Sequence, residues 1–328
     1  MSVIITGVAG FIGFHLACRL IKDGQHVIGI DSLPDDTNKF IRDARLRILQ
    51  EEHNFSFHQY DIAVFMDSNI FKRIKDATCI VHLAAQSGIR CNKNADDYIQ
   101  SNIVGFTHLL EYAKESMIPI IYASSSAVYG TNNTHSVNCE NDLTDNPCSL
   151  YAATKKSNEI ISETYNHLYN MSIIGLRLFT VYGPWGRPDM ALFKWAYSIS
   201  QGNHVELYNH GKYSRDFTYI DDVIECIIRL MQTNRNESFY GKHVILNVGS
   251  GVPSNIVDCL KLIEHNIGTS AQVIFSPPNK ADVMFTCADT SRLMLLIGYT
   301  PTTPLHEGIK MFTYWFQEYI HKYNCYVK

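Results

Sequence analysis

The sequence lacks the marks of several large classes of protein. Its nine cysteines are scattered and form no C-x-x-C pair, so their spacing supports neither a disulfide framework nor a zinc site. No apolar run approaches the roughly 20 residues that a membrane-spanning helix needs. Charged residues make up only 18% of the 328 residues, and the net charge is −4. The cysteine spacing leads us to expect no metal ion. The charge balance excludes a strongly basic surface, so we expect neither nucleic acid nor a membrane as partner.

We also expect no leader segment. An apolar run begins at Ser2, and no basic segment followed by an apolar stretch precedes it. Unpaired cysteines are typical of proteins in a reducing compartment. We therefore expect a cytoplasmic protein.

The first half of the sequence alternates short apolar runs with segments of helical periodicity. This order predicts right-handed βαβ units, and hence an α/β fold with a doubly wound parallel sheet of the Rossmann type. The expected strands are Val3–Thr6, His26–Ile30, Phe55–Gln59, Cys79–Leu83, Pro119–Ala123 and Ile173–Leu178. The expected helices are Phe11–Lys22, Lys39–Glu51, Ser68–Ile74, Asp97–Glu115 and Tyr151–Tyr169.

After about Pro184 the rhythm changes, because proline and glycine become denser and the strands shorter. We expect a smaller C-terminal α/β lobe that binds the substrate over the carboxyl edge of the sheet. Its expected strands are Val205–Tyr208, Val244–Val248 and Val273–Phe275, and its helices Met190–Ser200, Ile220–Gln232, Asn255–His265 and Pro304–Tyr319. We place a cofactor-binding domain at residues 1–183 and this lobe at 184–328, with a soft boundary that strands can cross.

A glycine-rich turn follows the first strand and reads GVAGFIG at residues 7–13. In a G-x-x-G-x-x-G turn, Gly7 permits the tight turn, Gly10 lets the backbone approach a pyrophosphate, and Gly13 allows close packing of helix and strand. Phe11 and Ile12 then start a helix whose N-terminal amide groups favour a diphosphate. Because the turn lies between a strand and a helix, it predicts a dinucleotide site.

Asp31 ends the second expected strand. A carboxylate there accepts both hydroxyls of the adenosine ribose and repels a 2′-phosphate, and no arginine follows it directly in the sequence. We therefore expect NAD rather than NADP. Further cofactor contacts are expected just past the third and fourth strands, at Asp61, Ile62, Leu83, Ala84 and Ala85.

Tyr151 and Lys155 form a Y-x-x-x-K pair in a helical segment, where residues four apart share one face. A nearby ammonium favours the phenolate of a tyrosine, which makes Tyr151 a candidate base and Lys155 its partner and a cofactor ligand. Ser125 and Ser126 follow the fifth strand. We expect the Ser125 hydroxyl to bond the substrate hydroxyl that is oxidised.

Together these residues resemble the extended short-chain dehydrogenase/reductase superfamily over nearly the whole chain. The resemblance narrows at three runs: SLYAATKK at 149–156, LRLFTVYGPWGRPDMA at 176–191 and SRDFTYIDD at 214–222. These runs are similar to those of UDP-glucuronate 4-epimerases. The family implies a UDP-sugar substrate and an NAD cofactor that oxidises the sugar at C4 and then reduces it from the opposite face.

The resemblance also implies a set of site residues. Ser125 and Tyr151 would act at the reacting hydroxyl, with Lys155 on the cofactor. The substrate would meet Ser126, Thr180 and Arg187 around the sugar carboxylate, Arg215 on the diphosphate, and Asp282 near the uridine ribose. A guanidinium can hold a carboxylate in a planar fork, although Arg187 could instead pair with a protein acid such as Asp189. Arg215 could likewise pair with Asp216 or Asp221.

Three other functions stay open at this stage. One is a 4-epimerase of neutral UDP-sugars, such as UDP-glucose or UDP-N-acetylglucosamine. A second is a nucleotide-sugar 4,6-dehydratase, which would need a further acid and base where Ser126 and Ala127 stand. A third is a non-catalytic NAD-binding module, which would be expected to have lost Tyr151 or Lys155.

Two expected helices carry more apolar residues than one sheet face needs. These are Ile99, Ile103, Phe106, Leu109 and Leu110 on the first, and Ile160, Ile161, Tyr165 and Leu168 on the second. An apolar excess predicts a buried interface. The family resemblance implies a homodimer through a four-helix bundle, and the alternative is packing within one subunit.

Overall fold

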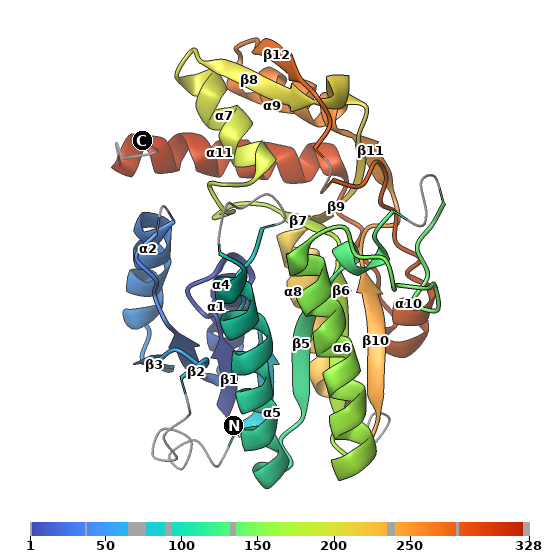
Figure 1. Ribbon diagram of the computed structural model, residues 1–328. Coiled ribbons are helices and arrows are strands. Elements are labelled where there is room, and N and C mark those ends of the chain that lie inside the picture. The colour runs from blue at the N-terminus through green and yellow to red at the C-terminus, as the bar shows by residue number, and fades with distance from the viewer. Residues whose placement is uncertain are drawn as a thin grey trace.

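The computed structural model describes residues 2–36, 38–64, 77–88, 94–131, 136–234, 240–279 and 282–323. Its main sheet has seven parallel strands in the order β10-β6-β5-β4-β1-β2-β3 (Figure 1). These are β1 Ser2–Thr6, β2 His26–Asp31, β3 Phe55–Gln59, β4 Ala77–His82, β5 Ile120–Ser125, β6 Ile173–Leu178 and β10 His243–Val248. The predicted doubly wound α/β fold is confirmed. The expected helix Ser68–Ile74 lies outside the described residues.

β10 comes from the C-terminal part of the chain and pairs with β6, with Val244 opposite Ile174. The sheet therefore draws its strands from both sides of residue 184. Helix α8 (Ile220–Asn234) also returns from the second part and packs against α1 (Phe11–Lys22).

Both faces of the sheet are covered by helices. In β1, Val3 and Ile5 belong to the core under α1, whereas Ile4 belongs to the core under α5 (Gly105–Ser116). Helix α6 (Leu150–Tyr169) lies beside α5 (Figure 1). Successive side chains of a strand point to opposite faces, so a strand buried on both faces reads as a continuous apolar run. This explains why the strands could be found from the sequence.

The expected single helix Asp97–Glu115 is interrupted in the structure. It consists of α4 (Ala95–Ile99), a π-helical turn η1 (Gln100–Val104) and α5. The wider turn places Asn102 inside the protein, where it is 1% exposed. Such π-turns are rare and are frequent at functional sites.

The smaller lobe lies above the carboxyl ends of the main strands (Figure 1). One sheet has the order β11-β9-β7, and β12 pairs in parallel with β8. The strands are β7 Thr180–Tyr182, β8 His204–Tyr208, β9 Ser214–Tyr219, β11 Pro253–Asn255 and β12 Gln272–Ser276. The helices are α7 Ala191–Ser200, α9 Ile256–Ile267, α10 Ser291–Ile297 and α11 Leu305–Tyr323. None of β7, β9, β11 and α10 was predicted from the sequence.

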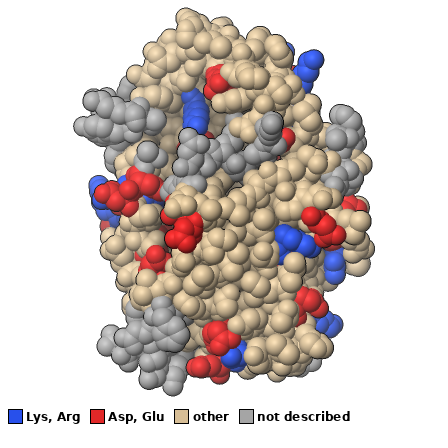
Figure 2. Space-filling model, in the orientation of Figure 1, with Lys and Arg blue, Asp and Glu red and all other residues tan. Residues whose placement is uncertain are grey.

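Charged side chains of both signs are scattered over the face drawn in Figure 2, without a patch of one sign. Among the described helices, none combines the length and the apolar character that crossing a bilayer requires.

Candidate active site

The candidate site lies where the strand order reverses, between β1 and β4. In open α/β sheets, ligands bind at this switch point, outside the carboxyl ends of the strands. The glycine-rich turn follows β1, Leu83 follows β4, and Ser125 ends β5. All three segments therefore reach the same edge of the sheet.

The glycine turn is too crowded for side chains. A Cβ on Gly7, whose φ is +72°, would lie 2.6 Å from the Ala84 nitrogen, and one on Gly13 would lie 2.2 Å from the Gly7 oxygen. Gly10 is the N-cap of α1, and no side chain caps that helix. Since the first amide groups of a helix have no partner within it, they remain directed at the edge where a diphosphate would sit. These features fit a dinucleotide.

The Asp31 carboxylate is built into the same turn. One oxygen accepts from the Ala9 amide at 3.0 Å, and the other accepts from the Leu33 amide at 3.0 Å. Burial raises the pKa of Asp31, while these two bonds and the charges of Arg42 and Arg45 oppose the rise. The carboxylate is thus held rigidly at the end of β2.

The expectation that no arginine lies near Asp31 is wrong in three dimensions. Arg42 and Arg45 come from α2 (Lys39–Gln50), which the sequence separates from β2. Their donors are directed elsewhere, since Arg42 pairs with Asp36 at 2.8 Å and Arg45 donates to the Trp185 carbonyl at 2.6 Å.

Asp31→Ala should weaken NAD binding by about 10- to 100-fold, because a hydrogen bond to a charged group contributes about 1.5–3 kcal/mol. The wild type should bind NAD much more tightly than NADP. Calorimetric titration of apoprotein with both dinucleotides measures this. Asp35→Ala, which changes an 85% exposed side chain nearby, is the matched control. Equal affinity of the wild type for NAD and NADP would contradict the assignment.

The other expected cofactor contacts occupy the two loops beside the turn. Ile62 is buried, and its carbonyl accepts from His108 at 3.0 Å, while Asp61 is exposed. The Leu83 amide donates to the Thr6 carbonyl at 3.0 Å, which brings residues 83–85 against the glycine turn. Their contacts with a cofactor remain a prediction.

Ser125 and Tyr151 meet at the carboxyl edge. Ser125 caps the short helix η2 (Ser126–Tyr129), its Oγ accepting from the Ala127 amide at 3.1 Å. Tyr151 lies in the first turn of α6, which Ser149 caps by accepting from the Ala152 amide at 3.2 Å. The Ser125 hydroxyl lies close enough to the Tyr151 phenol to lower its pKa.

Burial raises the pKa of the Tyr151 phenol, and the Ser125 hydroxyl and the charge of Arg187 oppose that rise. The sequence had suggested Lys155 for this electrostatic role. Lys155 Nζ instead donates to the Ala123 carbonyl at 2.8 Å and lies 5.9 Å from the centre of the Tyr151 ring. Burial lowers the pKa of Lys155 to about 8. The charge of Arg187 contributes to lowering the pKa of the phenol, and the partnership of Lys155 with Tyr151 stays a prediction.

Arg187 is held by a protein acid. Its Nε donates to Asp189 Oδ1 at 3.0 Å and its Nη2 to Asp189 Oδ2, which is the pairing left open by the sequence. Although burial raises the pKa of Asp189, the charge and hydrogen bonds of Arg187, with smaller contributions from a backbone hydrogen bond and Lys194, together outweigh it and the pKa is lowered. Arg187, Thr180 and Phe11 line one small cavity of about 40 Å³. The guanidinium thus lies beside Thr180 and the first residue of α1.

Arg215 and Asp282 lie on two adjoining segments of the lobe. The Ser214 amide donates to the Met284 carbonyl at 3.0 Å, which brings the start of β9 against the loop that contains Asp282. Arg215 donates to the Ser214 carbonyl at 3.0 Å, and its guanidinium lies over the Tyr213 ring. Ser126 is half-buried in η2.

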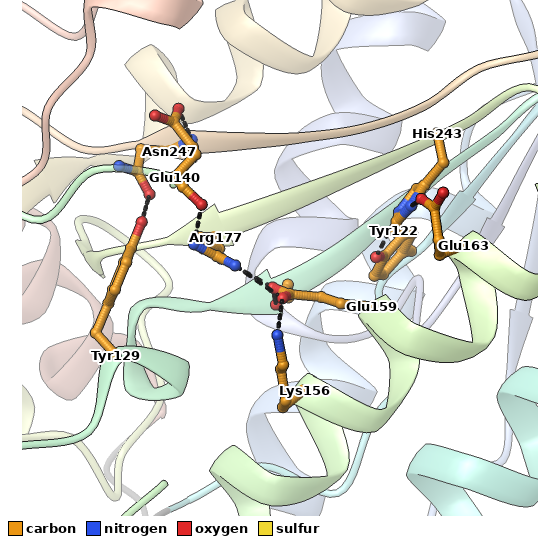
Figure 3. Close-up of polar contacts among 10 residues, drawn as sticks. Tyr122, Tyr129, Glu140, Lys156, Glu159, Glu163, Arg177, His243 and Asn247 are labelled. Atoms are coloured by element: carbon orange, nitrogen blue, oxygen red, sulfur yellow. Dashed lines mark hydrogen bonds and ion pairs between the residues drawn. The ribbon is translucent and has the colours of Figure 1, made fainter. Parts of the chain in front are cut away.

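A buried ionic network behind the serines was missed from the sequence (Figure 3). Arg177 on β6 grips Glu159 on α6 with its Nε and Nη2, both at 2.9 Å. Ser124 Oγ donates to the same carboxylate at 2.6 Å, and Lys156 reaches it at 3.9 Å. The network joins β5, β6 and the catalytic helix directly behind Ser125. Arg177 could have indicated this network, because it lies within an apolar strand and charged residues are rarely buried without a partner.

Asn102 is the second residue that sequence reasoning missed. Its Oδ1 accepts from the Gln86 amide at 2.7 Å, and its Nδ2 donates to the Gln86 carbonyl and to Thr154 Oγ1, both at 3.0 Å. It therefore ties the loop after β4 to the residue before Lys155. The π-turn that aims it inward leaves no mark in the apolar pattern.

The fold and the site together define a class. A doubly wound sheet, a glycine turn with an acid at the end of β2, and a Ser-Tyr-Lys group at the carboxyl edge belong to dinucleotide-dependent enzymes that oxidise or reduce an alcohol carbon. Residues 3–249 match the NAD dependent epimerase/dehydratase family, and the chain belongs to that family.

Three similar proteins show which members of this family the chain resembles. Protein CapI from Staphylococcus aureus is 40% identical, over 98% of this chain and 100% of its own. UDP-glucuronate 4-epimerase 4 from Arabidopsis thaliana is 40% identical, over 97% of this chain and 76% of its own. The crystal structure of UDP-glucuronic acid 4-epimerase from Bacillus cereus, in complex with UDP-glucuronic acid and NAD, matches with a TM-score of 0.90 at 31% identity, over 97% of this chain and 100% of that one.

Proposed function

We propose that this enzyme interconverts UDP-glucuronate and UDP-galacturonate, with NAD as its bound cofactor. The observation that carries the proposal is the position of Arg187. This cation acts on the Tyr151 phenol and lines a cavity with Thr180, at the place where a sugar bearing a carboxylate would react. The similarity to UDP-glucuronate 4-epimerases over almost the whole chain supports it.

In this proposal Tyr151, as phenolate, takes the proton from the sugar 4-hydroxyl, and Ser125 steadies that proton through a hydrogen bond to the phenol. When bound, NAD accepts the hydride from C4 and returns it to the opposite face of the rotated 4-keto sugar. Tyr151 then gives the proton back, so that the overall reaction is neither oxidation nor reduction. Lys155 is the residue expected to hold the nicotinamide ribose.

The carboxylate makes the intermediate fragile. A 4-keto uronate is a β-keto acid, which loses CO₂ most easily when the C–CO₂ bond aligns with the carbonyl π system. A bidentate guanidinium fixes the plane of a carboxylate. Arg187 holds Asp189 through Nε and Nη2 in this structure, so in the proposal it exchanges this partner for the sugar carboxylate and, with Thr180 and Ser126, holds it out of that alignment. The site would then protect the product as well as select the substrate.

Arg187→Ala should lower kcat/KM for UDP-glucuronate by about 10²-fold or more, since truncating one partner of a buried charge pair costs about 2–5 kcal/mol. Any activity on UDP-glucose should fall far less. Chromatographic separation of the product sugars measures both. Lys261→Ala, which removes a 69% exposed cation of the same lobe, serves as control. If both activities fell equally, a neutral-sugar 4-epimerase would be the better function.

We also propose a homodimer through α5 and α6. The prediction that Phe106, Leu109 and Leu110 contribute to this interface was wrong, because these side chains are fully buried in the subunit's own core. The support now comes from α6, where Ile160 and Leu168 are 57% and 61% exposed. Residues eight apart share one face of a helix, and the surface between the two helices carries few charges (Figure 2).

Sedimentation at micromolar concentration should therefore show a dimer. Ile160→Asp combined with Leu168→Asp should shift the population to monomer, because two charges would be buried at the interface. Leu295→Asp, at an 85% exposed position on α10, is the control that should stay dimeric. A wild type that sediments only as monomer would disprove the assembly.

Two remaining assignments belong to the same proposal. We place the enzyme in the cytoplasm, and the free cysteines among the described residues support this. We assign cofactor and catalytic residues mainly to residues 1–183, and the nucleotide sugar mainly to 184–328.

A further inference from the structure

Three consecutive carbonyl groups directly before Arg187 accept hydrogen bonds from the cofactor-binding part of the chain. His15 on α1 bonds the Pro184 oxygen at 2.9 Å. Arg45 Nη2 on α2 donates to the Trp185 oxygen at 2.6 Å and to the Gly186 oxygen at 3.5 Å. Segment 184–186 is therefore tied to α1 and α2 through side chains rather than through a strand ladder.

Arg45 also holds the glycine turn. Its Nη1 donates to the Ala9 oxygen at 2.9 Å, in the middle of the turn between Gly7 and Gly10. One planar guanidinium thus joins the cofactor turn to the segment that carries Arg187. Only an arginine presents donors in a fixed fork that can span both.

The burial of Arg45 is costly and calls for an explanation. The side chain is 1% exposed, its hydrogen bonds go to carbonyl groups rather than to a carboxylate, and its Nε has no hydrogen bond. Burial lowers the pKa of Arg45 to about 9; the charges of Tyr319 and Asp31 oppose this lowering, while that of Arg187 adds to it. A buried cation without an acid partner is destabilising, so packing alone would favour an apolar residue there.

His15 forms the second tie. Since a carbonyl oxygen can only accept, the hydrogen lies on His15 Nε2. Burial lowers the pKa of His15 to about 4, so the ring stays neutral and the bond persists at neutral pH.

The tied segment is itself strained and tightly packed. Trp185 has a φ of +58°, in the left-handed region that a bulky residue rarely adopts. Its ring lies 5.4 Å from those of Phe14, Trp315 and Tyr319. Such strain persists where the surroundings over-determine a conformation, and it clusters at ligand sites.

We propose that Arg45 is a positioning residue that sets Arg187 relative to the cofactor turn, with His15 as its helper. Resting on the proposed function, this makes recognition of the sugar carboxylate depend on a side chain that touches neither sugar nor carboxylate. The Arg187 guanidinium must meet the carboxylate in one plane while C4 faces the cofactor. Arg45 fixes the glycine turn relative to segment 184–186 because it donates hydrogen bonds to both.

The test measures binding to NAD-loaded protein that carries Tyr151→Phe, so that no turnover occurs. The ligands are UDP-glucuronate and UDP, which share the nucleotide, whereas only UDP-glucuronate carries the sugar and its carboxylate. Arg45→Met should weaken UDP-glucuronate by about 10- to 100-fold, as a misplacement of about 1 Å does, and UDP by less than about twofold. Arg45→Lys should lie between, since it keeps the charge and loses the fork. Arg47→Met, an exposed arginine on the same helix, is the control.

A double-mutant cycle separates positioning from a general loss of structure. In protein that also carries Arg187→Ala, Arg45→Met should no longer change the ratio of the two affinities. The proposal would be overturned if Arg45→Met weakened the binding of both ligands equally, or if its effect were just as large in protein that carries Arg187→Ala. If Arg45→Met does not fold, His15→Leu gives the same comparison through the Pro184 bond. If the parent protein binds UDP-glucuronate no better than UDP, the proposed function fails instead.

Discussion

Tyr151→Phe should lower kcat for UDP-glucuronate by about 10²–10⁴-fold, the usual contribution of a positioned acid-base group. The substitution removes the hydroxyl whose pKa Ser125 lowers and keeps the ring at the start of α6. Bound NAD should therefore stay with the protein. Product sugars separated by chromatography give the rate, and absorbance of the nucleotide released on denaturation gives the NAD content. Tyr169→Phe, on the same helix, should change neither.

The pH profile gives an independent check. The phenolate is the active form, so the wild-type rate should rise with pH over the range below the Tyr151 pKa. The Ser125 hydroxyl lowers that pKa, so Ser125→Ala should move the rise to higher pH. Activity retained by Tyr151→Phe, or a rise that moved to lower pH in Ser125→Ala, would show that another group is the base.

Glu159→Gln should destabilise the protein by about 3–5 kcal/mol, because breaking a buried ion pair leaves a charge without its partner. The side chains of Glu159 and Arg177 are 5% and 4% exposed, and no solvent is available to replace the lost carboxylate. Chemical or thermal denaturation, with activity measured in parallel, would record the loss. Since Ser124 donates to the same carboxylate, activity should fall as well.

Glu163→Gln is the matched control for this variant. Glu163 is one turn further along α6 and bonds His243, but its side chain is 68% exposed (Figure 3). The Glu163 side chain is solvated, and the buried His243 ring keeps its contact with the Tyr122 hydroxyl at 3.2 Å, so loss of the Glu163 charge should cost less than about 1 kcal/mol. Equal destabilisation by the two variants would show that the Arg177 pair contributes nothing beyond an ordinary surface contact.

The strands and most helices could be predicted because their signals are local. The helix Phe11–Lys22 and the strands Phe55–Gln59 and Ile173–Leu178 have the predicted ends, since a glycine or a polar turn bounds each apolar pattern. Strands β7 and β11 have three residues each, too few to show alternation. The interruption at η1 depends on the tertiary bonds of Asn102, which no periodicity encodes.

The candidate site was predictable where one motif holds all its parts. The glycine turn and the Tyr151–Lys155 pair are of this kind. The role of Arg45 could not be predicted, because an amphipathic helix also fits a position on the surface. The carbonyl groups that accept its hydrogen bonds lie 36 and 140 residues away in the sequence. For Arg187, the sequence could name Asp189 as a partner but could not decide for it, because that choice depends on side-chain packing.

The return of β10 to the main sheet has a consequence for how the chain folds. A nascent chain that has emerged only to residue 183 presents β6 with one edge unpaired, and that edge carries Ile173, Ile174 and Leu176. Such an edge invites pairing with other chains. The partner strand His243–Val248 is synthesised some 60 residues later, and synthesis runs at about 5–20 residues per second. We therefore expect the sheet of the cofactor half to be completed only after residue 248 has been synthesised.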